Sequence, residues 1–190
     1  MNTSRTRDRD LAQRWAHDLL SRTDWVILDT ETTGLDPRAE VVQIAVVGPD
    51  RTSLLNSLVR PTIPIPPDAT AIHGISDAMV AAAPGLPQIM PRLGAILFGK
   101  LVIAYNAAFD ERLLQQSAFR HRLGWPMCQW ACAMEQYARF VGQWSDRHQT
   151  YTFQKLPRRR GYQGEKHQAV DDCLATLDLI HMMAGVAARR

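Results

Sequence analysis

The sequence predicts an α/β fold in which helices pack on a mixed β-sheet. Short apolar runs at residues 25–28 and 101–104 have the length and composition of buried strands. Two further strands, 41–47 and 53–59, flank a Gly-Pro-Asp turn at 48–50 and so predict a hairpin. Strands come first and are followed by a mixture of helices and strands, which is the order expected of a mixed sheet with helices packed on it.

The remaining elements follow from the spacing of apolar residues and from the prolines. Apolar residues at helical spacing predict helices over residues 8–20, 87–99, 107–119, 130–141 and 168–187. Residues 61–67 hold four prolines and are expected to form an extended loop. Residues 142–166 are polar, basic and aromatic without a clean period, and we expect the longest irregular region there.

Composition limits the class of protein. The chain has 190 residues, of which 46% are hydrophobic and 22% are charged, as in an ordinary soluble globular domain. It has no apolar run of about 20 residues and no signal-peptide core near its start, so we expect a cytoplasmic protein without a membrane partner. An odd number of cysteines fits a reducing compartment. We interpret Cys128, Cys132 and Cys173 as buried small residues.

Positive charge is concentrated in one segment. The formal net charge is only +3, but the stretch from Arg147 to Lys166 holds six basic residues and Glu165 as its only acid. Four aromatic residues interleave with these charges: Trp144, Tyr151, Phe153 and Tyr162. Aromatic rings beside positive charge suit the binding of a single-stranded nucleic acid. A solvated loop over a small satellite core explains the same composition equally well.

Two carboxylates follow the first buried strand. Asp29 and Glu31 are two residues apart, so a continuing strand would point both side chains the same way. Placing two acids together at a buried strand end is unfavourable unless a cation lies between them. Mg²⁺ prefers such hard oxygen ligands. The alternative is two exposed acids at a strand end, because a lone Asp-x-Glu is common.

Three later residues complete a candidate constellation. Asp110 is expected in the first turns of a helix, where it could reach the same pocket or simply favour the helix start. His167 precedes the closing helix and could act as a base or be a capping or surface residue. Asp172 shares a helix face with apolar residues, whereas Asp171 lies on a face that reads as solvent-exposed. We therefore choose Asp172 as the ligand candidate.

These residues together resemble a known family. The segments Asp29-Thr30-Glu31-Thr32-Thr33-Gly34-Leu35 and Asn106-Ala107-Ala108-Phe109-Asp110, and His167 five residues before Asp172, resemble the three motifs of the DnaQ-like, or DEDDh, exonucleases. The resemblance runs from about Trp25 to Ile180. It implies a ribonuclease-H-like fold with a central mixed five-stranded sheet flanked by helices. It also implies a division into an N-terminal helical appendage, 1–24, and an exonuclease domain, 25–190.

The resemblance further implies a 3′→5′ exonuclease that hydrolyses the terminal phosphodiester of DNA and releases nucleoside 5′-monophosphates. Two Mg²⁺ or Mn²⁺ ions would be held by Asp29, Glu31, Asp110 and Asp172, and His167 would take a proton from the attacking water. The residues implied to contact the 3′-terminal nucleotide are Thr32, Gly34, Leu35, His73, Asn106 and Phe109. An ordinary turn at Thr32 to Leu35, and packing roles for His73 and Phe109, are the alternatives.

More than one function is compatible with these motifs. They do not separate DNA from RNA, so an RNA exonuclease resembling ribonuclease T or oligoribonuclease is one alternative. The Pro-rich loop before Ile72-His73-Gly74-Ile75 resembles the proofreading subunits of bacterial replicative polymerases, which favours DNA and makes a polymerase a candidate partner. Two further hypotheses are a catalytically weak polymerase-associated module and a structural protein with coincidental acids. Tyr105 stands where many family members carry His, and we expect it to alter the pocket lining without removing activity.

Overall fold

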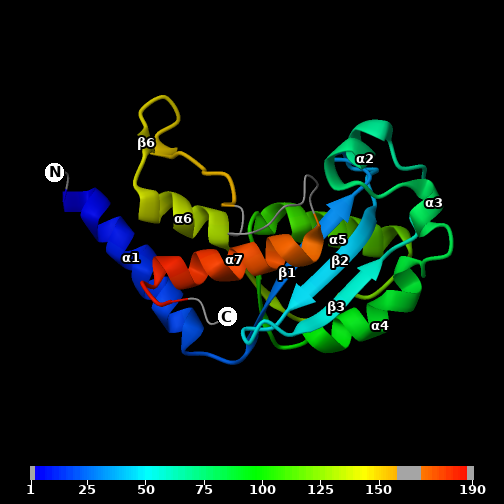
Figure 1. Cartoon of the computed structure of the whole chain (residues 1–190), viewed down its shortest axis with the longest axis horizontal. Helices are drawn as coiled ribbons and strands as arrows, with labels where there is room; N and C mark the ends of the chain where they lie inside the picture. The colour runs from blue at the N-terminus through cyan, green and yellow to red at the C-terminus, as the bar shows by residue number, and fades with distance from the viewer. Residues whose placement is uncertain (1–2, 158–167, 188–190) are drawn as a thin grey trace.

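A computed structural model describes residues 3–157 and 168–187, and at its centre lies a five-stranded sheet in the order β3-β2-β1-β4-β5 (Figure 1). The strands are β1 (Trp25–Thr32), β2 (Val41–Val47), β3 (Ser53–Leu58), β4 (Leu101–Ala104) and β5 (Gln129–Cys132). The predicted hairpin is present, because β2 pairs antiparallel with β3. β2 also pairs antiparallel with β1, whereas β1, β4 and β5 are mutually parallel, so the sheet is mixed as predicted.

One strand of the central sheet was missed. A helix was predicted over residues 130–141, but residues 129–132 form β5 and the helix α6 covers only Ala133–Val141. The prediction was wrong there because residues 129–132 pair in parallel register with β4, a contact distant in sequence that overrides local periodicity. Parallel strands need a crossover between them, and α5 (Ala107–Arg120) provides it.

Helices cover both faces of the sheet. On one face, α4 (Leu86–Leu97) and α5 bury their apolar residues against the even-numbered residues of β1, Val26 and Leu28. On the other face, α7 (Ala169–Met183) and α6 pack against the odd-numbered residues Trp25 and Ile27. Neighbouring residues of β1 therefore face different helices, as the period of a strand requires. This alternation decides where the acidic side chains point.

The first helix, α1 (Thr3–Leu20), packs against α6 and α7 on the α7 side of the sheet (Figure 1). Ala12, Ala16 and Leu19 are buried, and the last two belong to the same apolar cluster as Trp25. The helix predicted over residues 8–20 is thus present and begins earlier. The division of the chain at residue 24 stays a prediction.

The connections between the main elements contain short pieces that the apolar pattern did not predict. The expected loop is present over residues 61–66, and two short helices follow it, α2 (Pro67–His73) and α3 (Asp77–Val80). Four residues of this region form a small apolar cluster with Val42: Ile65, Ala69, Ile75 and Val80. Among the described residues of the expected irregular region, β6 (Trp144–Ser145) and β7 (Thr150–Tyr151) form a two-stranded sheet.

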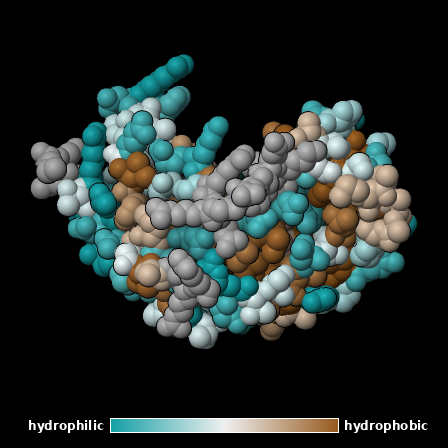
Figure 2. All heavy atoms as spheres, viewed as in Figure 1, coloured by the Kyte–Doolittle hydropathy of each residue, from teal (hydrophilic) through white to brown (hydrophobic). Residues whose placement is uncertain are grey.

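The surface is hollowed between the β6–β7 hairpin and the region of α2, and the hairpin that projects beside the hollow is mainly hydrophilic (Figure 2). Figure 1 shows that α7 begins between these two regions. Within the described ranges, no helix is long and apolar enough to cross a membrane. Cys173 is buried as predicted, but Cys128 and Cys132 are only half-buried because they lie on or beside the outermost strand β5.

Candidate active site

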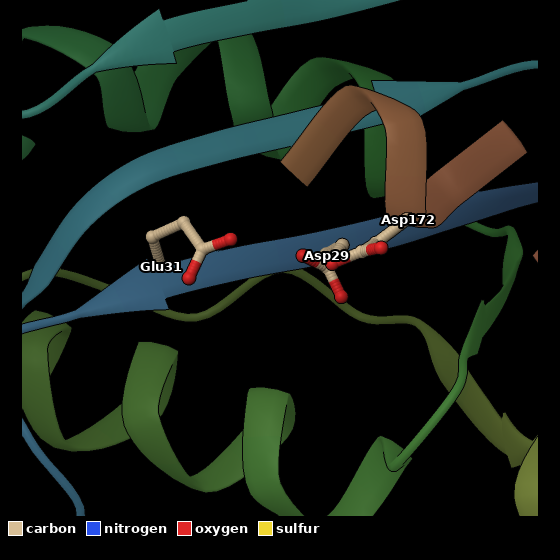
Figure 3. Close-up of side chains that lie close together, drawn as sticks. All are labelled: Asp29, Glu31 and Asp172. Atoms are coloured by element: carbon tan, nitrogen blue, oxygen red, sulfur yellow. The ribbon is translucent and has the colours of Figure 1, made fainter. Parts of the chain in front are cut away.

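Three of the predicted acidic residues come together at the carboxyl end of β1. Asp29 and Glu31 lie on the face of β1 that α7 covers, and Asp172 comes from the first turns of α7 (Figure 3). One carboxylate oxygen from each of the three lies within 4.8 Å of the others. Both Asp29 and Glu31 belong to the strand itself, which extends to Thr32, beyond the end at residue 28 that the apolar run predicted.

The environment of this acidic group makes its negative charges unfavourable. Glu31 is only 8% exposed, and its Oε1 atom has no hydrogen-bond partner among the described residues. Burial raises the pKa of Glu31 to about 8, and the nearby Asp172 and Asp110 add to the shift. Burial, followed by the charges of Asp110, Asp172 and Glu31, raises the pKa of Asp29 well above its usual value. A buried, unpartnered oxygen among clustered carboxylates fits a divalent cation.

Asp110 approaches β1 from the opposite face. It lies on α5, is 3% exposed, and its Oδ1 accepts hydrogen bonds from the backbone N (3.0 Å) and Oγ1 (2.8 Å) of Thr30. Burial raises the pKa of Asp110 to about 7, although the two Thr30 bonds oppose that shift. Asp110 is not one of the three residues whose carboxylate oxygens lie within 4.8 Å of one another. Its charge nevertheless contributes to the raised pKa values of Asp29 and Glu31.

The start of α7 is fixed by β2. Gln43 pairs across the sheet with Glu31, and its Oε1 accepts a hydrogen bond from the backbone N of Ala169 at 3.4 Å. This contact satisfies one of the free N–H groups at the helix start and sets the position of the turn that carries Asp172. Asp171 and Asp172 are both half-buried, so exposure alone does not separate them. Geometry does, since Asp172 is the one that joins Asp29 and Glu31.

The predicted base and four of the six basic residues of the segment lie outside the described residues. His167 lies outside the described residues, as do Tyr162 and the basic residues between 158 and 166. In the described part of the segment, Trp144 and Tyr151 pack edge to face with ring centroids 5.2 Å apart, and the Tyr151 hydroxyl donates to Asp8 Oδ2 at 2.6 Å. These contacts favour a local packing role for the two rings, whereas Phe153 is 55% exposed.

The loop after β1 carries three predicted nucleotide contacts. Thr32 is buried and its Oγ1 donates to the backbone oxygen of Gly34 at 2.8 Å. Gly34 does not adopt a positive φ. Leu35 is 76% exposed, although its side chain is apolar. An exposed apolar side chain on the loop that follows the strand of Asp29 and Glu31 is available to contact a ligand.

The other three predicted contacts differ in their surroundings. His73 is buried, with Nε2 3.2 Å from the Thr32 oxygen and Nδ1 accepting from the backbone N of Ile75 at 3.0 Å. These contacts tie the end of α2 to the end of β1. Asn106 is exposed directly before α5. Phe109 is half-buried, and the Arg112 guanidinium lies 5.6 Å from its ring centroid.

The chain matches known proteins over most of its length. The protein-family model described as "Exonuclease" covers residues 26–180. The chain belongs to this exonuclease family. The site and the mixed five-stranded sheet agree with its DnaQ-like, DEDDh members, which have a ribonuclease-H-like fold and depend on divalent metal ions. The protein is therefore a nuclease enzyme.

Curated relatives of this exonuclease include short and long proteins. It is 37% identical over 184 residues to the uncharacterized exonuclease CP81 of Escherichia phage 186, which covers 91% of this chain and 92% of the phage protein. It is 39% identical over 121 residues to a DNA polymerase III subunit epsilon-like protein of Rhodobacter capsulatus, which corresponds to 57% of this chain and 17% of that protein. It is 31% identical to exodeoxyribonuclease 10 of Escherichia coli, over 81% of this chain and 66% of that enzyme.

Solved structures show the same fold. Exonuclease X in complex with 5′ overhanging duplex DNA is 28% identical and has a TM-score of 0.55, covering 86% of this exonuclease and 95% of that chain. The nuclease domain of 3′hExo, a DEDDh family member bound to rAMP, has a TM-score of 0.66 over 89% of this chain and 96% of that one. At 20% identity, the second match shows the fold alone.

Sequence reasoning missed two residues that organise the site, Thr30 and Gln43. Thr30 lies between the two acids of the first motif, and we predicted no role for it. In the structure it donates two hydrogen bonds to Asp110. Gln43 was hidden in a predicted strand of otherwise apolar residues. A single polar residue in an apolar strand is a usable signal, because burying a polar group is unfavourable unless it has a partner.

Proposed function

We propose that this exonuclease is a metal-dependent 3′→5′ enzyme that hydrolyses the terminal phosphodiester of DNA and releases nucleoside 5′-monophosphates. The observation that carries the proposal is the acidic group Asp29, Glu31 and Asp172, with the buried Glu31 Oε1 atom left without a partner among the described residues. Three acids held together in this way oppose folding unless positive charge joins them.

The proposed ligands of one Mg²⁺ or Mn²⁺ ion are Asp29, Glu31 and Asp172, and those of a second ion are Asp29 and Asp110. Two bound ions would supply the positive charge that stabilises the attacking and leaving oxygens of an in-line displacement. The carboxylates must lose their protons to act as ligands, so binding competes with protonation at Glu31, whose pKa is raised to about 8.

The remaining proposed roles belong to the chain's own side chains. His167 is the proposed general base, which takes a proton from the attacking water on a ring nitrogen, since an imidazole titrates near neutral pH. Thr30 orients Asp110 through two hydrogen bonds. The proposed contacts of the 3′-terminal nucleotide are Thr32, Gly34, Leu35, His73, Asn106 and Phe109. Of these, His73 would act by holding the backbone of Thr32, which it already contacts.

Similarity to exodeoxyribonuclease 10 and to a polymerase III epsilon-like protein supports DNA as the substrate and a DNA polymerase as a candidate partner. The structure of Exonuclease X with 5′ overhanging duplex DNA supports the same substrate class. Because the reacting phosphodiester is the same in RNA, the two substrates must be separated by experiment. The cytoplasmic location and the appendage at residues 1–24 also stay predictions.

The test uses 5′-labelled single-stranded DNA and RNA of identical sequence, each with Mg²⁺, with Mn²⁺ and with EDTA. We expect a ladder that shortens from the 3′ end, requires a divalent ion and is absent for the variant Asp29→Ala. Faster degradation of RNA would replace DNA with RNA in the proposal. No degradation of either strand with either metal would overturn it and favour a catalytically weak accessory module.

A further inference from the structure

The helix α5 presents a row of three long polar side chains to the loop that follows β1. Arg112, Gln116 and Arg120 are spaced four residues apart, so they lie along one side of the helix. We call residues 33–40 the β1–β2 loop. All three side chains donate hydrogen bonds to its backbone oxygens: Arg112 Nη2 to Leu35 (3.2 Å), Gln116 Nε2 to Asp36 (3.2 Å) and Ala39 (2.6 Å), and Arg120 Nη2 to Arg38 (3.0 Å).

We call these three side chains the clamp, and two of them, Arg112 and Gln116, are bonded to each other. Gln116 Oε1 accepts from Arg112 Nη1 at 3.2 Å, which leaves the Gln116 amide N–H groups for the loop. Arg120 also pairs with Glu40, at 3.3 Å between Nη1 and Oε1, and Glu40 is only 2% exposed. Gln116 is the central member, because it alone bonds two loop oxygens while it also accepts from Arg112. Connected hydrogen bonds of this kind hold a loop more firmly than single contacts.

The clamp and the acidic site share one helix. Asp110 lies two residues before Arg112 on α5 and is bonded to Thr30 in β1. The β1–β2 loop begins directly after the strand that carries Asp29 and Glu31, and it ends at the bond between Glu40 N and Thr33 Oγ1 (2.9 Å). One helix therefore contacts both the carboxylate end of β1, through Asp110, and the backbone that carries the exposed side chain of Leu35, through Arg112.

We propose that Gln116, with Arg112 and Arg120, is a positioning residue that sets where Leu35 stands relative to the carboxylates, and so how the enzyme holds the 3′-terminal base. The inference rests on the proposed function, because it assumes a nucleic-acid 3′ end at the acidic site. A loop that positions a ligand needs support from rigid elements, and the backbone oxygens of this loop obtain that support from α5.

The decisive variant is Gln116→Glu, which keeps the side-chain size but points an acceptor at two backbone oxygens. Its matched control is Gln115→Glu, which adds the same charge to the same helix at an exposed residue that bonds only Glu111 in the described contacts. We expect Gln116→Glu to raise KM for a single-stranded oligonucleotide about five- to tenfold, with kcat within about twofold. The backbone amides of residues 34–36, 38 and 39 should exchange hydrogen faster than in the wild type.

A second variant, Leu35→Ala, tests whether the clamp positions Leu35 or only makes the β1–β2 loop less mobile. If the clamp acts through Leu35, the effects of Gln116→Glu and Leu35→Ala on KM should not add, and both should shrink on an oligonucleotide whose 3′-terminal residue lacks its base. Additive effects, equal KM changes in Gln116→Glu and Gln115→Glu, or a loss confined to kcat would each overturn the inference while the wild type remains active. A wild type that degrades neither DNA nor RNA would instead overturn the proposed function.

Discussion

Glu31 and Glu40 are both buried glutamates near the same end of the sheet, but their surroundings differ. Glu40, 2% exposed, accepts from the backbone N of Thr62 at 2.7 Å and from the Thr62 hydroxyl, and it pairs with Arg120. Glu31, 8% exposed, has an oxygen without a partner among the described residues and acids for neighbours. A buried acid that is hydrogen-bonded and paired, such as Glu40, stabilises the fold. A buried acid among other acids, such as Glu31, is stabilised instead by a bound cation.

The largest expected effect is on activity, and it distinguishes Asp172 from its neighbour Asp171 on α7. Asp172→Asn should lower kcat by at least about a thousandfold, because it removes a proposed metal ligand while keeping the shape of the side chain. Asp171→Asn should stay within about threefold of the wild type, since Asp171 is outside the acidic group. Steady-state hydrolysis of a labelled oligonucleotide measures both. Equal losses in the two variants would contradict the assignment of Asp172.

The next effect is on stability, and it separates Glu31 from Glu40. In EDTA at pH 8, Glu31→Gln should raise the free energy of unfolding by about 1–3 kcal/mol, because it removes a buried charge whose Oε1 atom no described residue hydrogen-bonds. Glu40→Gln should lower it by about 2–4 kcal/mol, because it places an amide NH2 group where the buried carboxylate accepts from Thr62 and pairs with Arg120. Urea denaturation followed by circular dichroism measures both.

A change of the same sign in the free energy of unfolding for Glu31→Gln and Glu40→Gln would contradict the proposed difference between the two glutamates. If both variants destabilised the protein equally, Glu31 would have an ordinary structural role and the acidic group would lose its strongest support as a metal site. The same measurement with bound metal tests this interpretation further. With Mg²⁺ or Mn²⁺ in excess, Glu31→Gln should no longer have a higher free energy of unfolding than the wild type, because metal binding to the folded state stabilises the wild type more.

A smaller effect concerns pH. In EDTA, the wild type should lose stability as the pH rises from about 4.5 to 8, because an unfolded glutamate ionises while the pKa of Glu31 in the folded protein is raised to about 8. Above that pH the loss should level off. The increase in Tm on adding Mn²⁺ should be larger at pH 8 than at pH 6, by about 2–4 °C, since binding competes with fewer protons.

Differential scanning fluorimetry with and without EDTA checks this dependence, and Glu31→Gln is its control. The variant lacks the titrating carboxyl, so its stability should fall less over the same pH range. A metal-induced Tm change that decreases from pH 6 to pH 8 would contradict carboxylate ligands whose pKa is raised. No metal-induced change at any pH would contradict the proposed metal site.

Much of this molecule could be predicted from its sequence. The apolar runs of β1 and β4 and the hairpin of β2 and β3 were predictable because each is continuous and bounded by turn residues. β5 was not, because only pairing with β4 distinguishes residues 129–132 from the start of a helix. The approach of Asp172 to Asp29 was anticipated from helix periodicity and family motifs. Its support by Gln43 was not, because that contact joins residues 126 apart in the chain.

The smallest expected effect concerns Tyr105, which stands where many related enzymes carry His. Its hydroxyl donates to the backbone oxygen of Gln154 at 2.6 Å, so the residue ties the end of β4 to the segment after the β6–β7 hairpin. Tyr105→Phe should cost about 1 kcal/mol of stability and change kcat by less than about threefold, because it removes one hydrogen bond and no proposed ligand. Tyr137→Phe is a matched control on α6, where no described contact uses the hydroxyl in this way. A kcat loss of about a hundredfold in Tyr105→Phe alone would place the hydroxyl in the reaction and extend the site from the β1 carboxylates to β4.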